Sequence, residues 1–65
     1  MLAKRVKEYR RQKGLTHQKL AEKTGLSFNT ITKIEHGIGK SPTLYTLNKL
    51  ADALNVSIDE LVGRK

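Results

Sequence analysis

Residues Thr16 to Gly37 have the sequence THQKLAEKTGLSFNTITKIEHG, in which two short helical patterns are joined by a tight turn. Gly25 lies between the two patterns, where a residue able to adopt a positive φ is strongly favoured. Ser27 can cap the second helix by accepting a backbone N–H bond. Ile31 and Ile34, three residues apart, give that helix one apolar stripe. The segment therefore predicts two helices that meet at a sharp corner.

This arrangement is typical of a helix-turn-helix, which places its second helix in the major groove of DNA. Leu20 and Ala21 fit the inner face of the first helix, where a small side chain allows close packing. Leu26 fits the corner between the helices. We therefore expect residues 28–36 to form a recognition helix.

Length and composition limit the class of protein. The 65 residues suit a single domain, 1–65, with a thin margin of stability. The absence of cysteine excludes disulfides and thiolate metal sites. No apolar run approaches the roughly 18 residues of a membrane span, and the basic N-terminal segment lacks the apolar region of a secretory signal. We expect a soluble, cytoplasmic protein with no membrane partner and no cofactor or metal.

Positive charge is concentrated in one part of the chain. Residues 1–40 hold ten lysines and arginines against three glutamates, whereas residues 41–65 hold three basic and three acidic residues. The whole net charge of +7 therefore belongs to the first part. This distribution suggests one face that binds a polyanion and another that is free for other contacts. The alternative is a charge that only keeps the protein soluble.

Helical periodicity and end signals predict five helices and no strand. Gly14 closes the first helix, Asn55 takes the place of glycine at the end of the fourth, and Ser57 with Glu60 forms a capping box for the fifth. The expected helices cover about 2–12, 17–24, 28–36, 44–54 and 58–62.

Ten apolar side chains are expected to form the core, and four others an exposed patch for a partner. The expected core consists of Val6, Leu15, Leu20, Ala21, Leu26, Ile31, Ile34, Leu47, Leu50 and Leu54. The expected patch, on the last two helices, consists of Tyr45, Ile58, Leu61 and Val62.

The chain resembles the helix-turn-helix family of phage repressors and Cro proteins, also called the xenobiotic-response-element family. The motifs that carry the resemblance are KGLT, LAEKTGLS, TITKIEHG and SPTLYTLNKLADALNVSIDEL, and it extends from Leu2 to about Val62. It implies an all-α fold, a compact five-helix lambda-repressor-like DNA-binding domain with the helix-turn-helix as helices two and three. It also implies operator binding, usually as a dimer.

Two positions depart from the family pattern. Many members have a glutamine where this chain has His17, and that glutamine binds a phosphate and supports a recognition side chain. His17 can still donate to a phosphate, but the supporting contact is an open question. Asn55 replaces the usual glycine, a change we expect to affect stability more than function.

Four side chains on the third helix are expected to contact bases. At 100° per residue, the isoleucines mark the buried side, and the base-reading positions of the family fall on the outer side. These positions are Phe28, Asn29, Thr32 and Lys33. Asparagine suits adenine, lysine suits guanine, phenylalanine suits the thymine methyl group, and threonine offers a hydroxyl or a methyl group. The alternatives are that Phe28 packs at the core edge, Asn29 only caps the helix, and Lys33 binds a phosphate or is merely solvated.

Phosphate contacts are expected from helix N-termini and from polar side chains that flank the recognition helix. The candidates are Arg10, Thr16, His17, Gln18, Ser27, His36, Lys40 and Ser41. Arg10 has a second interpretation, because the resemblance implies a structural ion pair between Arg10 and Glu35. An unpaired carboxylate so close to the buried face of the helix would be costly.

The predicted function is sequence-specific binding of double-stranded operator DNA by a transcriptional regulator, most simply a repressor that acts as a homodimer. The alternative is an antitoxin or adaptor module that uses the same fold to bind a toxin or another protein. An enzyme is not expected, because His17 and His36 lie on different helices and the GIGKS segment at 37–41 lacks the spacing of a phosphate loop. The chain is interpreted either as one domain or as a fragment of a longer regulator.

Overall fold

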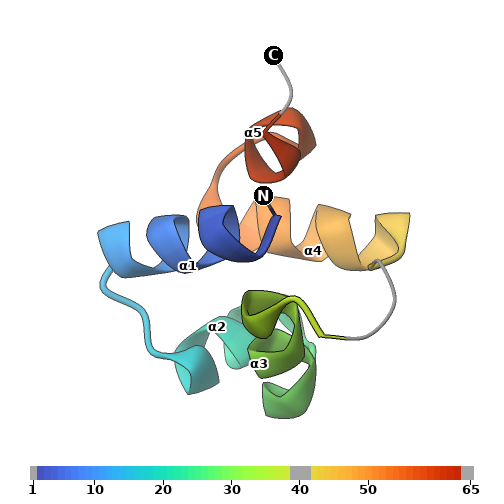
Figure 1. Cartoon of the computed structure of the whole chain (residues 1–65). Helices are drawn as coiled ribbons and strands as arrows, with labels where there is room; N and C mark the ends of the chain where they lie inside the picture. The colour runs from blue at the N-terminus through green and yellow to red at the C-terminus, as the bar shows by residue number, and fades with distance from the viewer. Residues whose placement is uncertain (1, 39–41, 64–65) are drawn as a thin grey trace.

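The computed structural model describes residues 2–38 and 42–63, which form five α-helices and no strand (Figure 1). The helices are α1 (Leu2–Gln12), α2 (His17–Thr24), α3 (Phe28–His36), α4 (Leu44–Leu54) and α5 (Ile58–Val62). The all-α, five-helix fold expected from the sequence is confirmed. None of these helices, within the described residues, combines the length and the apolar character needed to cross a membrane.

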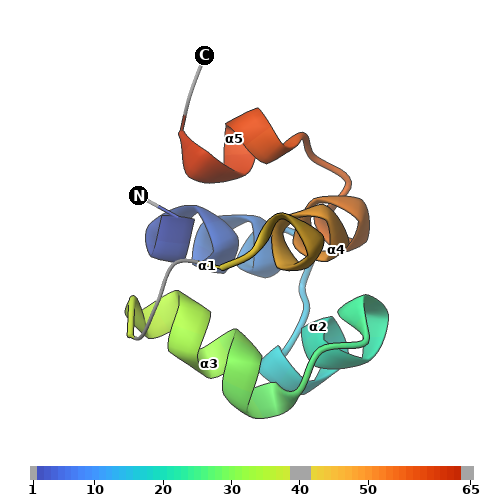
Figure 2. The same ribbon diagram turned by 90° about the vertical axis from the view of Figure 1, so that its right-hand side faces the viewer.

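The helices are stacked in three layers. α1 and α4 form the middle layer, α5 lies above them, and α2 and α3 lie below (Figures 1 and 2). α3 packs against α1 and α2, whereas α5 packs against α1 and α4. The helix-turn-helix is therefore exposed on the side of the molecule opposite to α5.

The helix ends follow from individual side chains. Each of the last four helices begins after a hydroxyl residue whose oxygen accepts a backbone N–H bond from three residues further on, an interaction worth about 1 kcal/mol. These caps are Thr16, Ser27, Thr43 and Ser57. Gly25 has a φ of 76° at the corner between α2 and α3, a conformation that other residues rarely adopt. Asn55, with a φ of 58°, ends α4 in the same way.

The core lies where the three layers meet. Six side chains have no exposed surface: Val6, Leu20, Ile31, Leu50, Leu54 and Leu61. Ala21 and Ala51 are also buried among them. Three more expected core residues, namely Leu15, Leu26 and Ile34, are partly buried and pack against it. Leu47 is partly buried but does not belong to the side chains that pack against this core, so the expectation is wrong for Leu47.

The expected apolar patch on the last two helices is wrong for two of its four members. Leu61 is completely buried, and Ile58 is half-buried against the core. The reason is that α5 packs on both α1 and α4, so these two side chains lie between α5 and the other helices. Val62 is partly exposed, and Tyr45 keeps 66% of its surface exposed.

Candidate nucleic-acid interface

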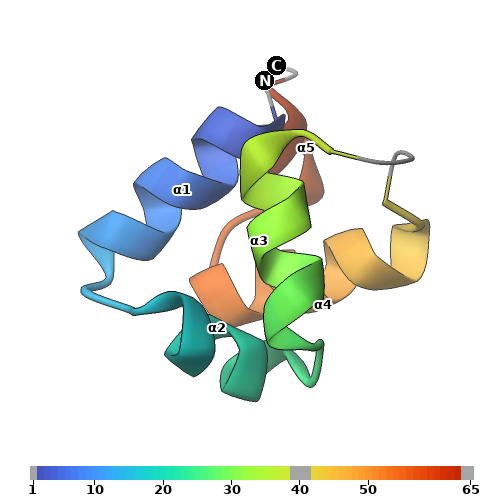
Figure 3. The same cartoon turned by 60° about the horizontal axis from the view of Figure 1, so that its bottom comes forward.

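The outer side of α3 forms the candidate nucleic-acid interface. Figure 3 shows α3 across the front of the molecule, with α2 beside it. On the inner face of α3, Ile31 and Glu35 are buried, whereas Asn29 and Lys33 are exposed on its outer face. The helix therefore has a fixed inner face and a free polar edge.

Phe28 stands at the first position of α3 and keeps 51% of its surface exposed. Its ring packs edge-on against the imidazole of His17, with 6.1 Å between the ring centroids and 77° between their planes. This exposure places Phe28 outside the buried core and the partly buried side chains around it. The geometry therefore disfavours the alternative in which Phe28 is a core-edge residue.

Thr32 is half-buried, and its hydroxyl donates to the carbonyl of Asn29 at 3.0 Å. A base contact through this hydroxyl would compete with that bond. Asn29 is exposed, and the cap of α3 is instead Ser27. The capping role that was the alternative for Asn29 is thus filled by another residue.

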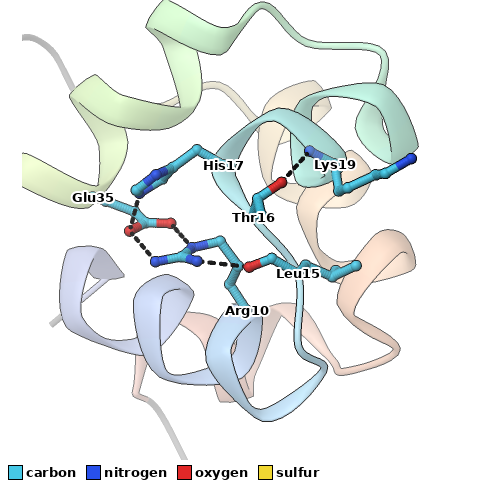
Figure 4. A network of polar contacts seen from close by, with 6 residues as sticks. All are labelled: Arg10, Leu15, Thr16, His17, Lys19 and Glu35. Carbon is cyan, nitrogen blue, oxygen red and sulfur yellow. Dashed lines mark hydrogen bonds and ion pairs between the residues drawn. The ribbon is translucent and has the colours of Figure 1, made fainter.

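A buried carboxylate ties α3 to α1 and α2 (Figure 4). The Arg10 guanidinium donates to Glu35 through Nε at 2.7 Å and through Nη2 at 3.3 Å, while Nη1 donates to the Leu15 carbonyl at 2.7 Å. His17 Nε2 lies 3.0 Å from the second Glu35 oxygen. The pair implied by the resemblance is therefore present, with an additional histidine partner.

Glu35 stays ionised at neutral pH. Burial of its side chain, which is only 1% exposed, raises the pKa of the carboxyl. Hydrogen bonds from Arg10 and His17, together with their charges, outweigh this effect and hold the pKa of Glu35 below its ordinary value of 4.5. An ionised carboxylate can only accept, so His17 Nε2 carries the proton that joins the two groups.

The Arg10 guanidinium is turned into the protein. The Arg10 side chain is only 10% exposed, and each of its three nitrogens donates to Glu35 or to the Leu15 carbonyl. These contacts favour the interpretation of Arg10 as a partner of Glu35, and its phosphate contact stays a prediction. His17 is 39% exposed, but its Nε2 is committed to Glu35. A phosphate contact of the ring would use Nδ1, which donates only when both ring nitrogens carry a proton.

The other phosphate candidates lie around the ends of α2 and α3. Thr16, Gln18, Ser27 and His36 are exposed. The first backbone N–H groups of a helix have no partner within that helix, and they favour an anion. Lys40 and Ser41 lie outside the described residues.

The contact that sequence reasoning missed is the one between His17 and Glu35. These residues are 18 positions apart and on different helices, so neither periodicity nor local spacing signals their contact. The expected position of Glu35 beside the buried face of α3 suggests that its carboxylate needs partners. Nothing in the sequence selects His17 as a partner in addition to Arg10.

The chain is similar to curated transcriptional regulators. The HTH-type transcriptional regulator SinR of Bacillus licheniformis is 34% identical over 65 residues, which cover 100% of this chain and 59% of SinR. The cryptic phage CTXphi transcriptional repressor RstR of Vibrio cholerae is 40% identical over 63 residues, which cover 97% of this chain and 55% of RstR. The chain thus spans somewhat more than half the length of these relatives.

Solved structures show the same arrangement of helices. The structure of SinR, the master regulator for biofilm formation, in complex with DNA matches with a TM-score of 0.91 at 34% identity, covering 95% of this chain and 98% of that one. The restriction-modification controller protein C.AhdI of Aeromonas hydrophila matches with a TM-score of 0.86 at 33% identity, covering 92% and 89%. The helix-turn-helix family pattern matches residues 6–61, and the chain belongs to this family.

Proposed function

We propose that this domain binds double-stranded DNA in a sequence-specific manner and acts as a transcriptional regulator, in the simplest case a repressor in the cytoplasm. The observation that carries the proposal is the free polar edge of α3, exposed on a helix whose opposite side is locked into the core. SinR, a relative with the same fold, has been solved in complex with DNA.

In this proposal α3 lies in the major groove. Asn29 pairs with an adenine edge, Lys33 reaches guanine, Phe28 contacts a thymine methyl group, and Thr32 supplies its methyl group or hydroxyl. The half-exposed ring of Phe28 and the exposed positions of Asn29 and Lys33 support these assignments.

Phosphates on either side of the groove are held by helix ends and polar side chains, which fix the position of the domain without reading sequence. The N-terminus of α2 supplies Thr16, His17 and Gln18, and Ser27 begins α3. His36, Lys40 and Ser41 would hold the far side.

The domain is proposed to act as a homodimer on two half-sites. One recognition helix covers few base pairs, and two-fold sites are spaced about 34 Å apart. The domain measures 29 × 25 × 18 Å, so two copies fit side by side at this spacing.

A second candidate is a module that binds a protein, such as an antitoxin or an adaptor. Three large apolar side chains favour this candidate, because Ile38, Leu44 and Tyr45 keep at least 60% of their surface exposed. SinR has been solved in complex with the protein SinI. A protein-binding role for this chain is compatible with DNA binding by α3.

Binding to DNA duplexes separates the two functions. Fluorescence anisotropy would be measured on random duplexes and on duplexes selected by the domain from a randomised pool, at 50 and 200 mM salt. A DNA-binding regulator is expected to prefer the selected duplex by at least about a thousandfold and to weaken steeply with salt. Weak affinity for both pools with no salt dependence would contradict the proposal and favour the protein-binding module.

A further inference from the structure

α1 carries a row of basic side chains on the part of its surface that the other helices leave free. At 100° per residue, Lys4, Lys7 and Arg11 fall within about 60° of one another around the helix axis, and these three residues are termed the α1 stripe. Lys4 and Arg11 are exposed, and Lys7 is partly exposed. Among residues 2–38 and 42–63, none of the three forms an ion pair with a carboxylate. Glu8, the one acidic residue of α1, is exposed beside the stripe and is likewise outside these ion pairs.

The α1 stripe lies on the side of the free surface that adjoins α3. Arg10 marks the side of α1 that faces α3, because its guanidinium is bonded to Glu35. Around the helix axis, Lys7 is about 60° from Arg10 and Arg11 is about 100° from it. Arg5 is about 140° from Arg10 in the opposite direction, past the buried side of the helix. Figure 2 shows α1 with α3 below it and α5 above it, so the stripe is on the α3 side and Arg5 is on the α5 side.

The charges of the α1 stripe are unfavourable for the helix itself. The first turn of α1 contains Lys4 and Arg5 and no acidic residue, although the N-terminal end of the helix dipole favours negative charge. Lys7 and Arg11 are four residues apart, a spacing at which like charges repel each other. Places where a sequence breaks such local rules are commonly functional sites. A bound polyanion would compensate these charges.

A duplex bound by α3 brings phosphates to this side of α1. The major groove is about 12 Å wide and about 8.5 Å deep, and an α-helix with its side chains is about 10–12 Å across. A helix seated in the groove therefore fills it and lies between the two phosphate backbones. α1 packs directly on α3, and the axes of packed helices are about 8–10 Å apart. The side of α1 next to α3 is thus expected at the rim of the groove, where one backbone runs.

We propose that the α1 stripe binds the phosphate backbone along one rim of the major groove that α3 occupies. This inference rests on the proposed DNA-binding function, and it extends the phosphate contacts from the ends of α2 and α3 to the side of a third helix. Because phosphate contacts carry no base information, the stripe strengthens binding to every duplex and leaves the choice of sequence to α3.

The salt dependence of binding tests the proposal, with a control on the same helix. Fluorescence anisotropy would be measured between 50 and 200 mM salt, on the selected duplex and on random duplexes. We expect Lys7→Gln and Arg11→Gln each to lower the magnitude of the slope of log K against log salt by about 0.9 on both kinds of duplex. Arg5→Gln removes the same charge from the α5 side of α1 and should keep the wild-type slope, because a charge turned away from the duplex is largely screened. Wild-type slopes in Lys7→Gln and Arg11→Gln would overturn the proposal.

A phosphate scan shows whether these side chains make a contact or only add to a long-range attraction. Each phosphate of the selected duplex is replaced in turn by an uncharged methylphosphonate. We expect a replacement at the rim of the groove to weaken binding by the wild type and by Arg5→Gln, but to have no further effect on Lys7→Gln or on Arg11→Gln, since groups in direct contact are not additive. Additive effects at every phosphate would overturn the contact.

Thermal unfolding separates a role in binding from a role in the fold. Because the charges of the stripe are unfavourable within α1, the variant with Lys4, Lys7 and Arg11 all replaced by glutamine should melt no lower than the wild type. A lower melting temperature would overturn the argument that these charges serve a partner. If the wild type binds no duplex, the proposed function fails and the inference fails with it. If the wild type binds and all three single variants keep its slope, the inference alone fails.

Discussion

Arg10→Met tests the physical role of the buried ion pair. The substitution keeps an apolar stem of similar length but removes the guanidinium that makes two bonds to Glu35 and one to the Leu15 carbonyl. The Glu35 carboxylate, with 1% of its surface exposed, then keeps only the bond from His17.

The expected loss is large for so small a domain. Removal of one partner from a buried pair costs about 3–5 kcal/mol, because the other charge is left uncompensated. A chain of 65 residues is expected to have a total unfolding free energy of only about 3–10 kcal/mol. We therefore expect Arg10→Met to lose a large share of the unfolding free energy at 25 °C and pH 7.

Urea denaturation followed by circular dichroism measures this loss. Replacement of both partners, in Arg10→Met with Glu35→Leu, should recover most of the stability, since apolar residues of similar volume often replace a buried pair without cost. A loss below about 1 kcal/mol in Arg10→Met would refute the reasoning. So would a double variant that is less stable than the single one.

The pH dependence gives an independent check on the same pair. Because the pKa of Glu35 is lowered in the folded state, its stabilisation is complete above the ordinary value of 4.5 and is lost as the pH falls through the lower, folded-state pKa. In Arg10→Met the main cause of the lowering is removed while burial still raises the pKa. Its unfolding free energy should therefore fall less steeply below pH 4.5 than that of the wild type, and equal slopes would contradict the assignment.

Three further substitutions test the core, the interface and a helix end. Leu50→Ala should cost about 2–5 kcal/mol and abolish DNA binding through unfolding, as thermal denaturation would show; a folded variant that does not bind would contradict this. Asn29→Ala should weaken binding to the selected duplex by about 1–3 kcal/mol and relax specificity at one base pair, whereas an equal loss on random DNA would argue against base reading. Asn55→Gly should change the midpoint of urea unfolding little or raise it, because the φ of 58° suits glycine, and a clear loss would point to an unrecognised role of the asparagine side chain.

Most of the fold could be predicted because the helix ends are encoded locally. Ser27 and Ser57 each stand directly before a helix and accept a backbone N–H bond from its first turn. Gly25 and Asn55 end helices because each adopts a positive φ. Signals of this kind need no knowledge of the rest of the molecule. The inner face of α3 was predictable for a similar reason, since two isoleucines three residues apart mark it.

Other features required the packed structure. The burial of Leu61 was missed because α5 has five residues, too few for a periodic pattern to show which side faces inward. The resemblance implied the pair between Arg10 and Glu35, but the bond from His17 to Glu35 arises between helices that meet only after folding. The sequence therefore indicated which residues α3 exposes, but the groups that hold them in place could be seen only in the structure.

The central claim is that the outer edge of α3 meets the bases of DNA, and amide chemical-shift mapping tests it most directly. The ¹⁵N-labelled domain would be titrated with the duplex that it selects. We predict that the largest shifts fall within Phe28–His36 and at the start of α2, with little change in α5. Shifts confined to α4 and α5, with α3 unaffected by the duplex, would contradict the account.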